Sequence, residues 1–201
     1  LERLRLSSVA GLLIHHADDA LAEGSEFLYD VMHELKSKGL VEKIGFSVCT
    51  KEQINQLLDL YDFELIQVPV NVLDQRLIKG GELKKLKDKG IEVHARSIFL
   101  QGLLLMDPDT IHPFFNEIRL LLQKYKRFLY LNGLSFVEGA IEFIKKIPEI
   151  DHIIVGVNNL KQLKDNIQSF NRTNNNLNID SFKEFYINEP KFINPSSWKL
   201  N

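Results

Sequence analysis

Residues 43–60, with the sequence KIGFSVCTKEQINQLLDL, decide the fold class of this chain. The opening residues predict a short strand over Lys43–Ser47. Thr50 is followed three residues later by Gln53, and this capping-box pattern predicts a helix over Lys51–Leu60. A strand followed directly by an amphipathic helix is one βα unit of the kind that builds parallel sheets.

The same alternation of β-branched runs and helical periodicity recurs along the whole chain, which predicts an α/β protein. The other strands that we expect are Val9–Ile14, Leu65–Val68, Glu92–Ser97 and Ile153–Val157. A helix is expected over Glu26–Lys38 and a last one over Ile179–Tyr186. No linker rich in Pro, Gly or Ser divides the chain, so we expect a single domain over residues 1–201. These units fit either an open doubly wound sheet or part of a (β/α)8 barrel, which needs about 250 residues when complete.

Composition excludes several classes of protein. The chain has 201 residues, 44% of them hydrophobic and 26% charged, as is typical of a soluble globular protein. A net charge of −2 argues against binding to nucleic acid or to an anionic membrane. The apolar runs are far shorter than the roughly 20 residues of a membrane helix, and no signal peptide is visible, which favours the cytoplasm. The only cysteine, Cys49, is expected to be a small core residue and allows no cysteine-based zinc site.

Polar residues follow the predicted strands, where ligands bind in parallel α/β proteins. They are His15 with His16, Ser47, Gln67 with Asn71, Arg96 with Ser97, and Gly156 with Asn158. The alternative is that each of them only caps its strand or the next helix. Neighbouring residues of a strand point to opposite faces, so the two adjacent histidines cannot chelate one metal ion, and no metal is expected. We expect no functional role for the remaining histidines, which are His33, His94, His112 and His152.

Five segments carry a resemblance to a known family. They are Leu12-Leu-Ile-His15, Lys43-Ile-Gly-Phe-Ser47, Ile66-Gln67, His94-Ala-Arg-Ser-Ile-Phe-Leu-Gln-Gly102 and Val155-Gly-Val-Asn-Asn-Leu-Lys-Gln-Leu-Lys-Asp-Asn166. In their order and spacing they resemble strands four to eight of the aldo/keto reductases. The resemblance implies a (β/α)8 TIM barrel that is incomplete in this chain.

The resemblance also implies a function, which is hydride transfer between NAD(H) or NADP(H) and a small carbonyl or alcohol substrate. His15 then corresponds to the catalytic histidine that orients and polarises the substrate carbonyl, and Ser47 and Gln67 to the residues that hold the nicotinamide carboxamide. The other cofactor-binding residues that the resemblance implies are Arg96, Ser97, Phe99, Gln101, Gly156, Asn158, Gln162, Asp165 and Asn166.

The chain departs from the family pattern in several places. Val48 stands where the family usually has asparagine, and Arg96 stands in place of the aromatic residue that stacks on the nicotinamide. Gly156, Val157 and Gln162 replace the basic residues that commonly hold a 2′-phosphate, which favours NAD(H) over NADP(H).

The catalytic aspartate, tyrosine and lysine of the family lie on the first three βα units, which this sequence lacks. We therefore expect a clipped N-terminus, a chain that is inactive alone, and self-association through exposed strand edges. The alternative is a non-catalytic nucleotide-binding or regulatory module of the same fold, as in the β subunits of potassium channels. An aldolase-like barrel would need a lysine at a strand end, and none is present there.

Overall fold

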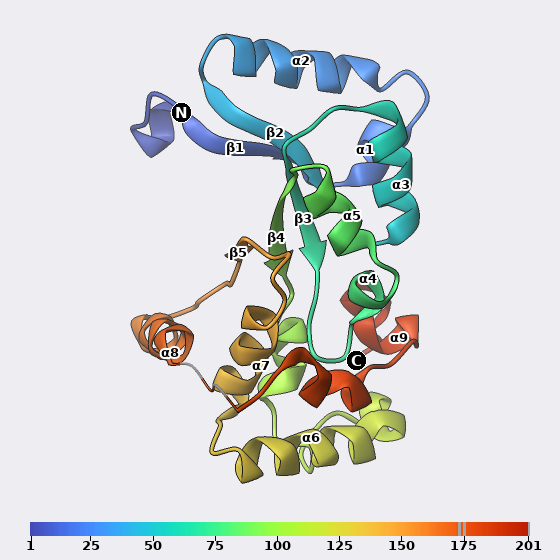
Figure 1. Ribbon diagram of the computed structural model, residues 1–201, viewed down its shortest axis with the longest axis vertical. Coiled ribbons are helices and arrows are strands. Elements are labelled where there is room, and N and C mark those ends of the chain that lie inside the picture. The colour runs from blue at the N-terminus through green and yellow to red at the C-terminus, as the bar shows by residue number, and fades with distance from the viewer. Residues whose placement is uncertain (173, 175, 201) are drawn as a thin grey trace. The chain divides into compact units, whose positions relative to one another are not determined.

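The computed structural model describes residues 1–172, 174 and 176–200, and its central feature is a five-stranded sheet (Figure 1). The strands are β1 (Val9–Ile14), β2 (Val41–Ser47), β3 (Leu65–Pro69), β4 (Glu92–Arg96) and β5 (His152–Ile153), and they lie in the order β1-β2-β3-β4-β5. The β1–β2 and β2–β3 pairs are parallel. Sheet order equal to chain order, with helices between the strands, is the pattern of consecutive βα units. The predicted α/β fold class is confirmed.

The chain divides into two compact units. The first, here called the sheet unit, comprises Leu1–Pro69, Leu77–Ala95 and Glu149–His152. The second, here called the helical unit, comprises Val70–Arg76, Arg96–Pro148 and Ile153–Asn201.

The sheet unit is built on β2, whose residues Ile44 and Phe46 are fully buried. The helix α3 (Lys51–Leu60) has the bounds that the sequence predicts. Its capping box is also present, because the Gln53 amide donates to the Thr50 side chain while the Gln53 side chain accepts from the backbone of Thr50.

Four further helical segments belong wholly to the sheet unit, namely the 3-10 turn η1 (Glu2–Leu4) and the helices α1 (Ala17–Leu21), α2 (Glu26–Ser37) and α5 (Glu82–Asp88). The predicted helix over Glu26–Lys38 therefore ends one residue early. Helix α2 runs alongside β1 and β2 (Figure 1) and buries Met32 against Val41 and Ile44.

The close approach of β2 to β3 depends on Gly45. Gly45 is in register with Leu65 of β3. A Cβ atom at position 45 would lie 1.6 Å from the carbonyl oxygen of Leu65, far inside van der Waals contact with backbone. Only glycine allows the two strands to pair at this point.

The helical unit has a core of aromatic rings between short helices. Its longer helices are α6 (Arg119–Leu131), α7 (Phe136–Lys145) and α8 (Leu160–Asn171). The ring of Phe182 lies 5.4 Å from that of Phe143 on α7, within the range of favourable aromatic pairs. The other described helices of this unit are short. They are α9 (Pro190–Ile193) and the 3-10 helices η2 (Leu100–Leu105), η3 (Pro113–Ile118), η4 (Ile179–Phe185) and η5 (Pro195–Ser197). Helix α4 (Arg76–Lys79) has residues in both units.

Several predicted bounds differ from the structure by one or two residues, and two predicted elements differ more. The last helix, predicted over Ile179–Tyr186, is the 3-10 helix η4. The last strand, predicted over Ile153–Val157, is only the two-residue β5. Strand β5 is at the edge of the sheet and Gly156 weakens the run that follows, so Val157 leaves the sheet and is 39% exposed.

In the part of the chain that the structure describes, no helix combines the length and the apolar character needed to span a membrane.

Candidate functional site

Three predicted site residues lie at neighbouring positions of the sheet unit. Ser47 is the last residue of β2 and is in register with Gln67 of β3. Ile14, the last residue of β1, is in register with Phe46, so His15 and Ser47 are the next residues along their strands. The structure therefore brings His15, Ser47 and Gln67 to three adjacent strands. Gln67 lies inside β3 rather than at its end, as the third of its five residues.

The hydroxyl of Ser47 is buried and has no hydrogen-bond partner among the described residues. Ser47 is 4% exposed, and its Oγ atom is itself buried. The strand register puts it beside Gln67, which is half-buried and whose carbonyl oxygen accepts from the Val48 amide at 3.0 Å. A buried hydroxyl without a partner costs about 1–3 kcal/mol, so this position is suited to a ligand that supplies the missing bond.

The two adjacent histidines lie on the surface. His15 directly follows β1, and His16 is the N-cap residue of α1. Both side chains are exposed, and their rings meet edge to face with centroids 4.6 Å apart. An exposed imidazole at a strand end can donate a hydrogen bond to a small molecule, which is the capacity that the predicted role of His15 requires.

Cys49 is exposed, so the prediction of a core residue is wrong. The strand β2 ends at Ser47, and the chain turns outward before α3 begins. The backbone amide of Cys49 donates to Oε1 of Gln53 at 2.7 Å, so this residue belongs to the start of the helix rather than to the strand.

The segment after β4 belongs to the helical unit and has unusual backbone geometry. Ser97, Leu100 and Gln101 have φ angles of 59°, 46° and 52°, in the left-handed region that side chains rarely adopt. Asn71 supports the first of these residues, because its Nδ2 donates to the Ser97 carbonyl at 3.2 Å. Such strain persists where surrounding structure enforces it, and it is concentrated at functional sites.

The remaining predicted residues of this segment differ in exposure. Arg96 ends β4, and its Nη1 donates to Oγ of Ser97 at 3.3 Å. Phe99 is half-buried, whereas Gln101 is exposed.

The predicted adenosine-binding residues lie on and before α8. Gly156 and Asn158 are exposed and precede the helix, three and five residues after the end of β5, so they are not at a strand end as predicted. Asn159 is the N-cap residue of α8 and accepts from the Gln162 amide at 2.9 Å, while Oε1 of Gln162 accepts from the Asn158 amide at 2.7 Å. The side chain of Gln162 therefore already supports the start of the helix.

Two further residues of the predicted adenosine-binding segment lie on α8 itself. The carboxylate of Asp165 pairs with Lys161 at 2.6 Å, and Asn166 is half-buried.

Three tyrosines that match no catalytic motif have structural roles. Tyr29 donates to the carbonyl of Asp62 at 2.6 Å, and Tyr61 donates to that of Ala20 at 2.9 Å. Tyr125 is fully buried in α6.

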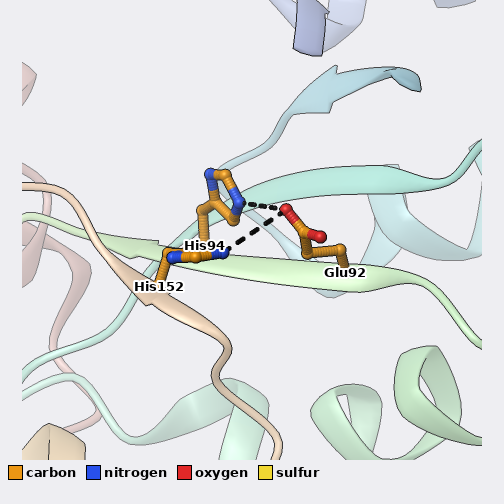
Figure 2. Close-up of side chains that lie close together, drawn as sticks. All are labelled: Glu92, His94 and His152. Carbon is orange, nitrogen blue, oxygen red and sulfur yellow. Dashed lines mark hydrogen bonds and ion pairs between the residues drawn. The ribbon is translucent and has the colours of Figure 1, made fainter. Parts of the chain in front are cut away.

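A polar cluster that the sequence analysis did not predict lies on β4 and β5 of the sheet unit. It consists of Glu92, His94 and His152, whose nitrogen and oxygen atoms lie within 4.8 Å of one another (Figure 2). Ion pairing with the ammonium of Lys43 and hydrogen bonding from His94 hold the pKa of the Glu92 carboxyl below its usual range. The alternation of Glu92 and His94 along one strand is the only local signal of this cluster, because His152 comes from a distant part of the chain.

Comparison with known proteins assigns the family. The model of the aldo/keto reductase family matches residues 1–187. This chain belongs to the aldo/keto reductase family. No protein of curated function matches its sequence.

Solved structures of aldo-keto reductases share the fold. The holo form of aldo-keto reductase AKR11C1 from Bacillus halodurans is 17% identical with a TM-score of 0.75, and the match covers 92% of this chain and 63% of that one. The apo form of that protein is 19% identical with a TM-score of 0.74 over the same shares of the two chains. The glycerol dehydrogenase AKR11B4 from Gluconobacter oxydans is 17% identical with a TM-score of 0.68, over 100% of this chain and 64% of its own. The chain thus spans less than two thirds of the length of these structures.

Proposed function

We propose that this chain binds a nicotinamide dinucleotide as part of an oxidoreductase that transfers a hydride between the cofactor and a small carbonyl or alcohol. The observation that carries the proposal is the buried hydroxyl of Ser47, which finds no hydrogen-bond partner in the described part of the chain and belongs to a residue in register with Gln67. Membership of the aldo/keto reductase family supports the same chemistry. A bound nicotinamide supplies the carbon that gives or accepts the hydride.

Ser47 and Gln67 are the residues that would hold the carboxamide of the nicotinamide. A hydroxyl and a side-chain amide together offer donors and acceptors that match both ends of a carboxamide. Two contacts from neighbouring strands would fix which face of the ring meets the substrate, and this positioning is worth more to the reaction than the binding alone.

His15 is the residue that we propose for orienting the substrate. Its imidazole is exposed and follows the strand next to β2, so it can donate a hydrogen bond to a carbonyl oxygen. Such a bond stabilises the negative charge that develops on this oxygen as the hydride arrives.

From the resemblance to the family, we propose residues 96–101 and 155–166 for the contacts to the rest of the dinucleotide. The strained segment at Ser97 and Gln101 supports this role, as does the resemblance of residues 155–166 to the adenosine-binding segment of the family. Gly156, Val157 and Gln162 carry no charge, and the one ammonium in the first turn of α8, that of Lys161, pairs with Asp165. We therefore propose that NADH binds at least as tightly as NADPH.

A second candidate is a nucleotide-binding module without catalytic activity. The hydrogen bonds of Tyr29 and Tyr61 to backbone carbonyls and the burial of Tyr125 favour it, because none of these phenols is available to protonate a substrate. The two candidates share cofactor binding and differ only in turnover.

Titration with NADH and NADPH, followed by cofactor fluorescence, tests the proposal. We expect saturable binding of NADH with an affinity equal to or higher than that of NADPH. Consumption of NADH in the presence of a panel of aldehydes and ketones would favour the enzyme, whereas binding without consumption by this chain alone is expected of both candidates. If neither cofactor binds saturably, the proposal fails.

We also propose that the chain associates with itself. The surfaces that we expect to pair are the edge strands of the sheet, β1 and β5, because unpaired strand edges associate with other chains. Light scattering on a size-exclusion column should give a mass above 23.2 kDa, whereas a monomer at high concentration would contradict this expectation.

A further inference from the structure

The cluster of Glu92, His94 and His152 has the composition of a metal site. Glu92 and His94 are the first and third residues of β4, so their side chains leave the same face of the sheet, and His152 is the first residue of β5. Val93, between them, is fully buried on the opposite face. Figure 2 shows both imidazole rings directed at one carboxylate oxygen.

The distances within the cluster suit an ion at its centre. Oε1 of Glu92 lies 2.7 Å from Nε2 of His94 and 3.7 Å from Nε2 of His152. The two imidazole centroids are 4.8 Å apart at an interplanar angle of 76°, so the rings do not block each other. A tetrahedral ion with bonds of about 2.0–2.1 Å needs donor atoms about 3.3 Å apart, so small side-chain rotations are enough to reach that geometry.

The surroundings orient these groups and balance their charge. Lys43 holds Oε2 of Glu92, which leaves Oε1 turned toward the histidines. The carboxylate of Asp151, next to His152, is fixed by Lys87 at 2.7 Å and by the Val93 amide at 2.8 Å. Of these groups Lys43 contacts a ligand directly, and groups that fix a ligand in place raise the affinity of metal sites.

One side of the cluster is open to solvent. The side chain of His152 is 60% exposed, compared with 16% for His94 and 23% for Glu92. An ion can enter from that side and keep a water molecule as its fourth ligand.

We propose that Glu92, His94 and His152 bind one divalent transition-metal ion, best matched by Zn²⁺, through two imidazole nitrogens and one carboxylate oxygen. Imidazole ligands favour zinc over magnesium and calcium, which prefer sites made of oxygen atoms alone. The ion joins the two-residue strand β5 to β4. None of the three ligands is a proposed cofactor residue, and the proposal does not depend on the proposed function.

The site also lies away from the carboxyl end of β2. The Glu92 amide donates to the carbonyl of Glu64 at 2.8 Å, so the cluster begins level with the start of β3. Ser47, by contrast, is the last residue of its strand. Zinc at the cluster should therefore leave the nicotinamide affinity unchanged, apart from any effect on overall stability.

Isothermal titration of the chelator-treated protein with ZnCl2 tests the proposal. We expect one ion per chain in the wild type, and a loss of affinity of at least tenfold in both His152→Ala and Glu92→Gln. His152 is exposed and glutamine has the shape of glutamate, so both variants should fold, which circular dichroism checks. Zinc should also raise the melting temperature of the wild type and not that of His152→Ala.

His16→Ala is the matched control, because it removes an exposed histidine that also stands next to a second imidazole. This variant should bind zinc as the wild type does. The proposal is overturned if zinc does not bind, if His152→Ala binds as tightly as the wild type, or if His16→Ala is the variant that loses the ion. Several weak ions that bind equally to all variants would overturn it as well.

Discussion

The two units each contain a buried hydroxyl that lacks a hydrogen bond among the described residues. In the sheet unit this group is the Oγ of Ser47, and in the helical unit it is the phenol of Tyr125. Ser47 is the last residue of a strand and is 4% exposed, whereas Tyr125 lies in the middle of α6 and is fully buried. Burial raises the pKa of the Tyr125 phenol above its usual range, so this group stays neutral.

The surroundings of the two hydroxyls differ. The ring of Tyr125 packs 5.2 Å from that of Phe185, and a Cβ atom at Gly139 would lie only 2.8 Å from its hydroxyl oxygen. The phenol is therefore enclosed, and its lost hydrogen bond is offset by the packing of the ring. Ser47 instead has Gln67 beside it and the exposed Cys49 two residues further on. We therefore propose a ligand contact for Ser47, at the end of its strand, and none for Tyr125, whose phenol is enclosed.

The largest loss of stability is expected from a substitution of Gly45, because its pairing with Leu65 belongs to the same register that places Ser47 opposite Gln67. Gly45→Ala puts a methyl group 1.6 Å from the Leu65 carbonyl oxygen, and neither strand can move away without breaking the sheet. We expect a loss of at least about 3 kcal/mol in the free energy of unfolding, measured by urea denaturation.

The control for this variant is Gly156→Ala, where the added methyl group meets nothing within 4 Å. Its stability should be close to that of the wild type. Equal stability of Gly45→Ala and the wild type would mean that β2 and β3 are further apart at Gly45 than they are in this structure.

A smaller change in the free energy of unfolding, and one of opposite sign, is expected from a substitution in the helical unit. Tyr125→Phe keeps the ring and removes a buried hydroxyl that has no partner within the described ranges, so the free energy of unfolding should rise by about 1 kcal/mol or stay unchanged. Urea denaturation measures it. A loss of more than about 1 kcal/mol would show that the phenol is hydrogen-bonded and that the comparison with Ser47 is false.

The smallest effect is expected on the pH dependence of stability, from an ion pair on the solvent-facing side of α6. Lys126, which follows Tyr125, pairs with Asp107 at 2.7 Å, and this bond lowers the pKa of the Asp107 carboxyl. A lowered pKa stabilises the folded state above the unfolded value of about 4, and this contribution is lost as the pH falls through the folded pKa.

The matching variant is Asp107→Asn, in which the melting temperature should depend slightly less on pH below about pH 4. Because the pair is exposed, the difference should be small and should shrink further in high salt. A steeper pH dependence in the variant would contradict the lowered pKa.

The regular part of the fold could be predicted from local sequence. The bounds of β1 and α3 and the capping box at Thr50 all follow from patterns within a few residues. The order of the strand-end residues carried the family assignment, which the match over residues 1–187 confirms.

Features that depend on distant partners could not be predicted. The run from Ile153 to Val157 has the composition of a strand, but it is at the edge of the sheet and pairs over two residues only. His152 and Glu92 meet because the sheet brings β4 and β5 together, and no local pattern encodes that meeting. The left-handed φ angle of Ser97 likewise occurs beside a bond from Asn71, which is distant in the sequence.

The most direct test of the account compares NADH binding by the wild type, Ser47→Ala and Tyr125→Phe, followed by cofactor fluorescence. Both variants delete one buried hydroxyl for which the described residues offer no hydrogen bond, so any effect of stability alone should appear in both. We predict that Ser47→Ala weakens NADH binding by about tenfold, the equivalent of one hydrogen bond, and that Tyr125→Phe leaves it unchanged. Equal affinities in all three proteins would contradict the assignment of Ser47 to the nicotinamide carboxamide.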